Sequence, residues 1–465
     1  MSILSVLTIG AQALKAQAAG VRTAGHNIAN VGTPGYSRQR VQLSSAPPES
    51  EGGVSFGLGV QLDSVRSVVD DLLESELVAL NSGVGFDDAR SRALGSVEAA
   101  FPVTGGIEAA LDAFFAAFSD LANHPAGTAE RSALLGSAQA LADLLRQTRN
   151  ELATTQANLD KNLDAAVRRA NAILPQIADL NAQIRIAESV GHPANDLRDQ
   201  RQLLLQDLSR LVGINTTENA EGETTVFAGG LLLVSGDRNA SFDATNLNPS
   251  GFRLVFYQAP GGTTFDATTF LTQGEIGATL RMRDTDLPDF LGRLDQLAKT
   301  LVDQVNLQHA AGYDLNGVTG TNFFDPIATV ARAADSVRVN AAVAADPSSI
   351  AAAQAATTLP GDNRNALALA GLRTAAFAAL GDLTLPDYFL TLLTDVGAQA
   401  KNATDALDFR QALLTDVQTR RDSLSGVSLD EEMTNLIQFQ RAFEAASRLV
   451  QVGDEMYQTV LDMLG

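Results

Sequence analysis

Residues 426–465 read GVSLDEEMTNLIQFQRAFEAASRLVQVGDEMYQTVLDMLG. Apolar or small side chains recur here every seven residues, at Leu429, Leu436, Phe443, Val450, Tyr457 and Leu464, with Phe439, Ala446, Gly453 and Val460 between them. A sustained seven-residue period is typical of a helix that packs along its length against other helices. The stretch therefore predicts a long terminal helix with a continuous apolar seam.

The beginning of the chain carries a matching pattern. A seam of the same period runs through Leu7, Leu14, Val21 and Ile28, flanked by a second row at Leu4, Ala11, Ala18 and Gly25. Chain ends normally fray, so matching seams at both ends indicate segments that are built to be buried. Pairing the two ends of one molecule would bury one side of each seam and leave the rest in water. We therefore expect both helices to be loosely ordered in the monomer and to fold fully among copies of the chain.

Composition excludes several classes of protein. The 465 residues carry a net charge of −21, and such a polyanion disfavours sequence-independent binding to nucleic acid or to anionic lipid. The absence of cysteine rules out disulfides, thiolate catalysis and cysteine zinc sites. No apolar run reaches the ~18 residues of a membrane span, and the start lacks the continuous apolar segment of a cleavable secretory signal.

The middle of the chain contains one β-like segment between helical segments. Helical patterns occupy 107–124, 128–189 and 195–212, a β-like pattern runs from Gly222 to about Leu280, and helix returns at Leu287. We predict a mainly α, multidomain fold with a β-rich insertion and paired terminal helices. The expected domains are a terminal coiled-coil assembly domain (1–45 and 426–465), a helical middle domain (46–190 and 281–425) and a β-rich outer domain with a leading helix (191–280).

No motif in the sequence supports an active site or a metal site. The histidines, His26, His124, His192 and His309, lack metal-ligand spacing, and Asp314-Leu-Asn316-Gly317 is better explained as an Asn-Gly turn than as a calcium loop. The carboxylates Asp430, Glu431 and Glu432 begin the terminal helix, where anions favour the helix dipole. Basic pairs such as Arg198 and Arg201 are interpreted as ion-paired helix faces. We predict no catalytic, cofactor or metal-binding residues.

Two blocks resemble a known family. NIANVGTPGYSRQRV (27–41) resembles the N-terminal signature of bacterial flagellar rod, hook and hook-associated axial proteins, and residues 426–464 resemble their C-terminal signature. The stretches NDLRDQRQLLLQDLSRLVGI (195–214) and GEIGATLRMRDTDLPDFLGRLDQLAKTLVDQVNLQHAAGYDLNG (274–317) are similar to the hook-associated members in particular. One departure is Gly32, where the family usually has asparagine before Thr-Pro-Gly-Tyr.

The resemblance implies a structural protein outside the cell, at the hook–filament junction of the flagellum. It implies that the terminal helices form the innermost layer of a tube and that Asn27, Asn30, Pro34, Gly35 and Tyr36 shape the turn to the next shell. The implied partners are copies of the chain in a ring, the hook protein, a second hook–filament junction protein, and an export chaperone on the C-terminal helix. Export would use the flagellar type III channel without signal cleavage.

Three other functions remain open at this point. The chain could be another axial protein, such as a hook or distal rod subunit, although the two middle stretches argue against it. An exported peptidoglycan hydrolase would need paired carboxylates within 46–425, and none stands at an arguable spacing. A host-binding or glycan-binding role could be added on the outer β-rich domain.

Overall fold

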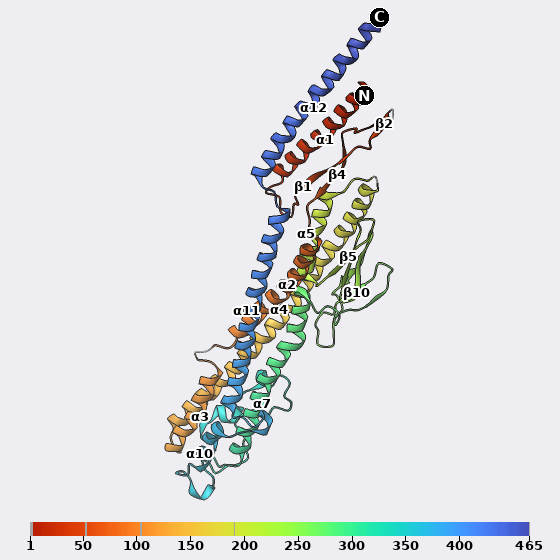
Figure 1. The fold of residues 1–465 in the computed structure, drawn as a ribbon. Helices are drawn as coiled ribbons and strands as arrows, with labels where there is room; N and C mark the ends of the chain where they lie inside the picture. The colour runs from red at the N-terminus through yellow and green to blue at the C-terminus, as the bar shows by residue number, and fades with distance from the viewer. Residues whose placement is uncertain (1–2, 52–53, 103–104, 190, 465) are drawn as a thin grey trace.

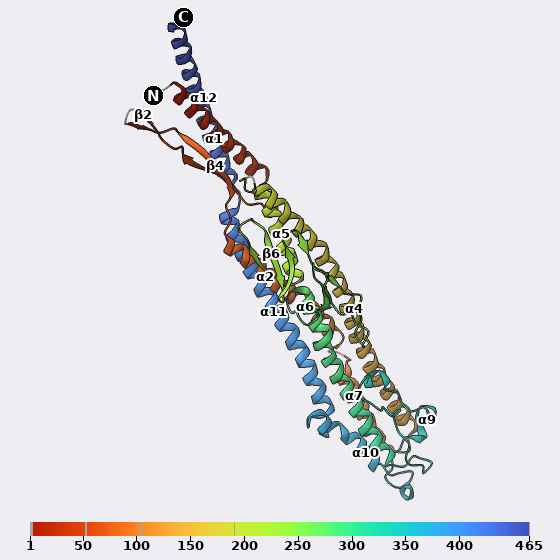
Figure 2. The same ribbon diagram turned by 90° about the vertical axis from the view of Figure 1, so that its right-hand side faces the viewer.

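Apolar helix faces repeat along most of this chain, and a computed structural model shows them packed into one elongated molecule (Figures 1 and 2). The structure describes residues 3–51, 54–102, 105–189 and 191–464. Both ends of the described chain lie at the same end of the molecule, so the chain runs out along a rod of helices and returns (Figure 1).

Two terminal helices pair side by side in opposite directions: α1 (Ile3–Ala29) and α12 (Leu429–Leu464). Small residues set their close approach, since a Cβ atom added at Gly20 would lie 2.5 Å from the Phe439 ring and one at Gly10 2.5 Å from Val450. A two-stranded ribbon of β1 (Gln39–Ser45) and β4 (Val60–Ser67), extended by β2 (Glu49–Glu51) and β3 (Val54–Phe56), lies along α1. The ribbon and the two helices form the terminal part of the molecule.

The rod is a bundle of long helices around a continuous apolar core. Its elements are α2 (Asp71–Ala99), α3 (Ile107–Asn123), α4 (Thr128–Glu188), α6 (Gly274–Arg281), α7 (Leu287–Ala310) and α11 (Leu385–Ser425). The helix α4 continues through Pro175. Side chains cap two of the helices: Asp70 accepts from Leu72 N at the start of α2, and Thr384 accepts from Asp387 N at the start of α11.

The β-rich part packs against α4 together with α5 (Asn195–Leu211) and has its own core. One sheet has the order β5–β6–β7–β8 and the other β11–β10–β9, all antiparallel. The strands are β5 (Asn215–Glu218), β6 (Thr224–Ala228), β7 (Leu231–Ser235), β8 (Arg238–Asn239), β9 (Ser241–Asp243), β10 (Phe256–Gln258) and β11 (Thr264–Asp266).

The expected end of the β region near Leu280 is wrong. Strand structure stops at Asp266, and 274–281 is the helix α6, which a π-helical turn η1 (Met282–Asp286) joins to α7. The side chains of Ile276 and Leu280 belong to the apolar core beneath the sheets. Burial of these residues on one helix face overrides the weak alternation in the sequence.

The far end of the rod is a compact tip of short elements between α7 and α11. It contains α8 (Ala333–Ser336), α9 (Ala341–Ala345), α10 (Arg364–Gly371) and the 3-10 turns η2 (Pro347–Ser349), η3 (Ala356–Thr358), η4 (Leu372–Thr374) and η5 (Ala378–Leu380). Two buried polar side chains organise it. His309 bonds to Thr321 O and Ala351 N, and Arg131 donates to four backbone oxygens, those of Pro125, Pro347, Ser348 and Ile350.

Candidate functional site: the terminal helices and the polar collar

The predicted seams lie at the α1–α12 contact. Leu7 stands beside Gly453, Gly10 beside Val450 and Gly20 beside Phe439, which fixes the antiparallel register. Leu14, Val21 and Ile28 are half-buried on α1, as are Leu436, Phe439 and Val450 on α12, and Ala446 is buried. The structure thus brings the two ends of the chain together through the residues of both repeats.

Much of the predicted seam of α12 is nevertheless exposed. A strict seven-residue row drifts around an α-helix by about 20° per repeat, so Leu429 and Phe443 stand at the edge of the contact, 45% and 40% exposed. Tyr457 and Val460 are exposed because α12 continues past the start of the described α1 (Figure 1). The side chain of Leu464 lies outside the described residues. A single copy of the chain leaves a large part of these apolar surfaces in water.

Below the helix pair, the predicted turn residues fold into a buried polar cluster. Asn27, 1% exposed, donates from Nδ2 to Gln39 O and to Glu432 Oε2, while its Oδ1 accepts from Tyr36 OH at 2.7 Å and from Gln39 N. Asn30 donates to His26 O and accepts from Thr33 Oγ1. The amide of Asn27 therefore ties the end of α1 to β1 and to the first turn of α12.

Pro34 and Gly35 make the turn itself. Gly35 has a φ of +75°, a region that favours glycine, and an added Cβ would lie 2.5 Å from the side chain of Leu203 in α5. Its carbonyl oxygen accepts from Arg421 Nη2 at 2.9 Å. The turn thus contacts α5, which packs with the β-rich part, and α11 of the rod.

Ion pairs complete this cluster, which we call the collar and define as Asn27, Tyr36, Arg38, Asp199, Arg421 and Glu432. Arg38 Nε donates to Glu432 Oε1 at 2.7 Å, and its Nη1 donates to Glu431 Oε2 at 2.6 Å. Arg421 Nε donates to Glu74 Oε1 at 3.0 Å, and Ser37 N donates to Asp199 Oδ2 at 2.8 Å. The collar joins α1, β1 and α12 to α2, α5 and α11.

Burial changes the protonation behaviour of two collar groups. Burial, reinforced by the charges of Asp196, Asp199 and Glu432, raises the pKa of Tyr36 well above its ordinary value. Its phenol therefore stays protonated and donates to Asn27. Burial also raises the pKa of Asp199 to about 6, although the hydrogen bonds from Ser37 and the charge of Arg421 act in the opposite direction.

Sequence reasoning assigned no role to Arg38 or Arg421 and read Glu432 as a helix-dipole partner. Glu431 and Glu432 do lie in the first turn of α12, but their carboxylates also bind Arg38 across 393 and 394 residues of sequence. Arg38 and Glu432 both fall within the two signature blocks. Their positions in these two blocks are the one feature of the sequence that could have suggested an ion pair between them.

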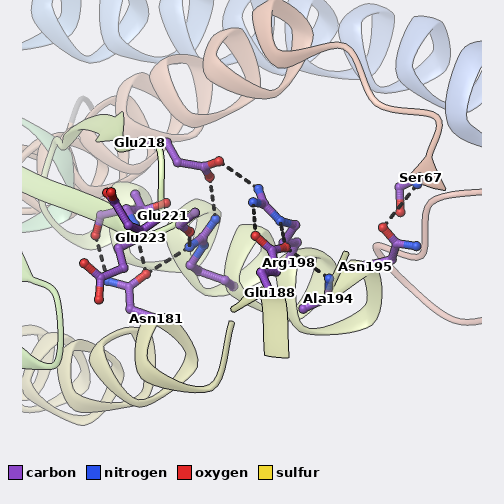
Figure 3. A network of polar contacts seen from close by, with 12 residues as sticks. Ser67, Asn181, Glu188, Ala194, Asn195, Arg198, Glu218, Glu221 and Glu223 are labelled. Atoms are coloured by element: carbon purple, nitrogen blue, oxygen red, sulfur yellow. Dashed lines mark hydrogen bonds and ion pairs between the residues drawn. The ribbon is translucent and has the colours of Figure 1, made fainter. Parts of the chain in front are cut away.

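A second polar network fastens the β-rich part to the rod (Figure 3). Arg198 of α5 pairs with Glu188 at the end of α4 and with Glu218 of β5. Arg201, 4% exposed, donates to Asn181 Oδ1, to Gly222 O and to Glu218 Oε2. This basic pair is ion-paired, as predicted, and it also fixes the orientation of the outer sheet.

Comparison with known proteins decides the family. The chain is 30% identical over 491 aligned residues to flagellar hook-associated protein 1 of Bacillus subtilis, with 98% of this chain and 97% of that protein covered. This chain belongs to the flagellar hook-associated protein 1 family. The proteins of that name from Escherichia coli and Salmonella typhimurium are each 23% identical, over 99% of this chain and all of their own length.

Family profiles and a solved structure agree with this membership. Residues 95–324 match the flagellar hook-associated protein FlgK helical domain, and residues 421–463 match the C-terminal region of the flagellar basal body rod FlgEFG proteins. The flagellar hook junction protein FlgK from Burkholderia pseudomallei superposes with a TM-score of 0.65 over 76% of this chain and all of that chain, at 18% identity. The predicted mainly α fold with a β-rich insertion is confirmed.

Membership in the hook-associated protein 1 family places the chain among structural components of the flagellum that associate with other axial proteins. Within the described residues, no group of histidine and acidic side chains has the arrangement of a metal site. No helix in the described part of the chain is long and apolar enough to cross a membrane.

Proposed function

We propose that this protein forms the first layer of the hook–filament junction, where copies of it assemble on the hook and carry a second junction protein and, beyond it, the filament. The observation that carries the proposal is similarity over nearly the whole length to flagellar hook-associated protein 1. The exposed apolar surface of α12 supports self-assembly, because exposed contiguous apolar patches on soluble proteins mark interaction sites. The collar would hold the assembling helices at a fixed orientation to the rod.

The expected route to this position is secretion through the flagellar export channel without cleavage. The apolar surface of α12 would then need a cover inside the cell, and an export chaperone that binds an amphipathic helix in an apolar groove would supply one. Outside the cell, the same surface would exchange the chaperone for neighbouring copies. The seam residues of α12 that the single chain leaves exposed, among them Leu429, Phe443, Tyr457 and Val460, are proposed contacts in both states.

Deletion of the gene in the source bacterium tests the proposal by electron microscopy. We expect complete hooks without filaments and filament subunits released into the medium, with filaments restored by the intact gene. A hook or rod subunit would instead give cells without hooks. Complementation with a chain that lacks 1–29 and 429–465 should fail, and normal incorporation of that chain would contradict the proposed role of the terminal helices.

A further inference from the structure

The helix α12 carries a second apolar row that α1 does not touch. Leu449, Val452 and Met456 are 40%, 51% and 47% exposed and follow one another at helical spacing, with Ala445 before them and Met463 after them on the same row. This row differs from the one that meets α1, which runs through Phe439, Ala446, Val450 and Gly453. We call it the second seam. Its three-and-four spacing fits a helix as its occupant.

The helix α1 has an exposed face of small side chains, in contrast to the large apolar side chains of the second seam. Ala11, Ala18 and Gly25 of the flanking row point away from α12; Ala11 and Gly25 are exposed, and a Cβ atom at Gly25 would meet nothing within 4 Å. These three side chains are small, so another helix can approach α1 closely there. The contact within the chain uses the same principle, because Phe439 and Val450 of α12 sit over Gly20 and Gly10 of α1.

Charge on the two helices is also complementary. α1 has no acidic side chain and carries Lys15 and Arg22, both exposed, next to its free face. On α12 the acidic side chains outnumber Arg441 and Arg448, and Glu444, Glu455 and Asp462 lie along the flank of the second seam that faces away from α1. Among the described residues, Lys15, Arg22, Glu444 and Glu455 take part in no ion pair, whereas arginines of the rod such as Arg149 and Arg410 are paired within the chain.

From these complementary free faces we propose that α1 of one copy packs its small basic face on the second seam of α12 of the next copy. This contact joins two different surfaces, so after two copies have paired each still offers one surface to a further copy. The contact can therefore repeat from copy to copy, and it closes into a ring where the rotation between neighbours allows it. Each α12 then lies between its own α1 and the α1 of a neighbour. The inference rests on the proposed self-assembly and names the surfaces that carry it.

Charge reversal gives a specific test in a strain that lacks the gene. One variant carries Lys15→Glu and Arg22→Glu, and the other carries Glu444→Lys and Glu455→Lys. Like charges facing each other oppose association, so each variant alone should lower the number of cells with attached filaments by about tenfold or more. Produced together, the two variants can alternate, so that α1 of each faces an α12 of complementary charge wherever unlike copies are neighbours, and filaments should return to within about twofold of the intact gene.

Matched controls separate this contact from other defects. Lys161→Glu with Arg238→Glu reverses two exposed charges of the rod and the outer sheet that have no partner in the described structure, and it should leave filament number unchanged. Secretion of each variant into the medium should equal that of the intact protein. Three results would overturn the contact: full assembly by either variant alone, no rescue in the mixture, or a block in secretion, which would assign these charges to an export partner. The intact gene in the same strain tests the proposed junction function separately.

Discussion

Arg38 and Glu432 lie 394 residues apart in sequence and form a 2.7 Å ion pair in which both side chains are nearly inaccessible to solvent. Asn27 donates to the other oxygen of the same carboxylate. The pair fastens the turn after α1 to the first turn of α12, at the point where the terminal helices meet the rod. Its contribution can be measured against a neighbour on the same helix.

Glu432→Gln should loosen the collar. The amide keeps the shape of the side chain but removes its charge, and a hydrogen bond to a charged group contributes about 1.5–3 kcal/mol. Hydrogen exchange of peptides covering 34–45 and 425–435 should rise accordingly. Glu431→Gln is the matched control, because Glu431 pairs with the same arginine from an exposed position and such pairs contribute about 0–1 kcal/mol. Equal effects of the two variants would contradict a special role for the buried pair.

Asp199 should titrate near pH 6. Because its pKa in the folded chain lies above the ordinary value of 3.8, the folded state binds the extra proton between about pH 4 and pH 6, and stability falls as the pH rises through that window. Carbon-13 NMR of aspartate carboxyl groups should show a resonance with this midpoint that is absent from Asp199→Asn. A midpoint below about pH 4.5 would contradict the buried environment assigned to this carboxyl group.

His309 should make the stability of the tip fall as the pH drops, whereas Asp199 makes stability fall as the pH rises. Burial lowers its pKa to about 4, so the unfolded chain binds more protons between about pH 6.5 and pH 4, and stability falls as the pH drops through that range, by up to about 3 kcal/mol. Urea unfolding of the tip, followed by hydrogen exchange of 311–384 at several pH values, should show this slope. The dependence of the unfolding free energy on pH should become weaker in His309→Gln. An unchanged dependence would show that other groups cause it.

Gly20→Ala should weaken the terminal helix pair although alanine favours helix. The added methyl group would lie 2.5 Å from the Phe439 ring, and overpacking costs about 1–3 kcal/mol, against a propensity gain of about 1 kcal/mol. Gly25→Ala, which meets no atom within 4 Å, should only stabilise α1. Circular dichroism during thermal unfolding of the monomer compares the two. Similar gains in helix stability from both would argue against close packing at Gly20.

The terminal helices should lose protection from hydrogen exchange towards their free ends in the monomer. Buried side chains are few along α1 and α12 and are mostly alanine or glycine, so local opening costs little. Residues 3–20 and 440–464 should exchange much faster than α3, α4 and α7, whose leucines and phenylalanines form the rod core. Strong protection over these two ranges would show that the helices are complete without neighbours.

The sequence predicted which helices pair but not how the collar closes. The heptads at Leu7 and Val450 required only local periodicity to recognise. The Arg38–Glu432 pair depends on the antiparallel register of α1 and α12, which no local pattern specifies. The end of the β region was missed because α6 is short, and its burial beneath the sheets is set by tertiary packing at Ile276. The domain boundaries and the seam contacts of the ring remain predictions.

The out-and-back path of the chain has an evolutionary consequence. All elements between α1 and α12 are connected to the terminal helices through two segments, 30–38 and 425–428. These segments lie side by side at the collar. Insertions or deletions at the outer sheet or the tip leave these two connecting segments unchanged. A chain of this family can therefore differ at the outer sheet and the tip while its terminal helices keep the same relation to each other, and relatives align across their full length despite low identity.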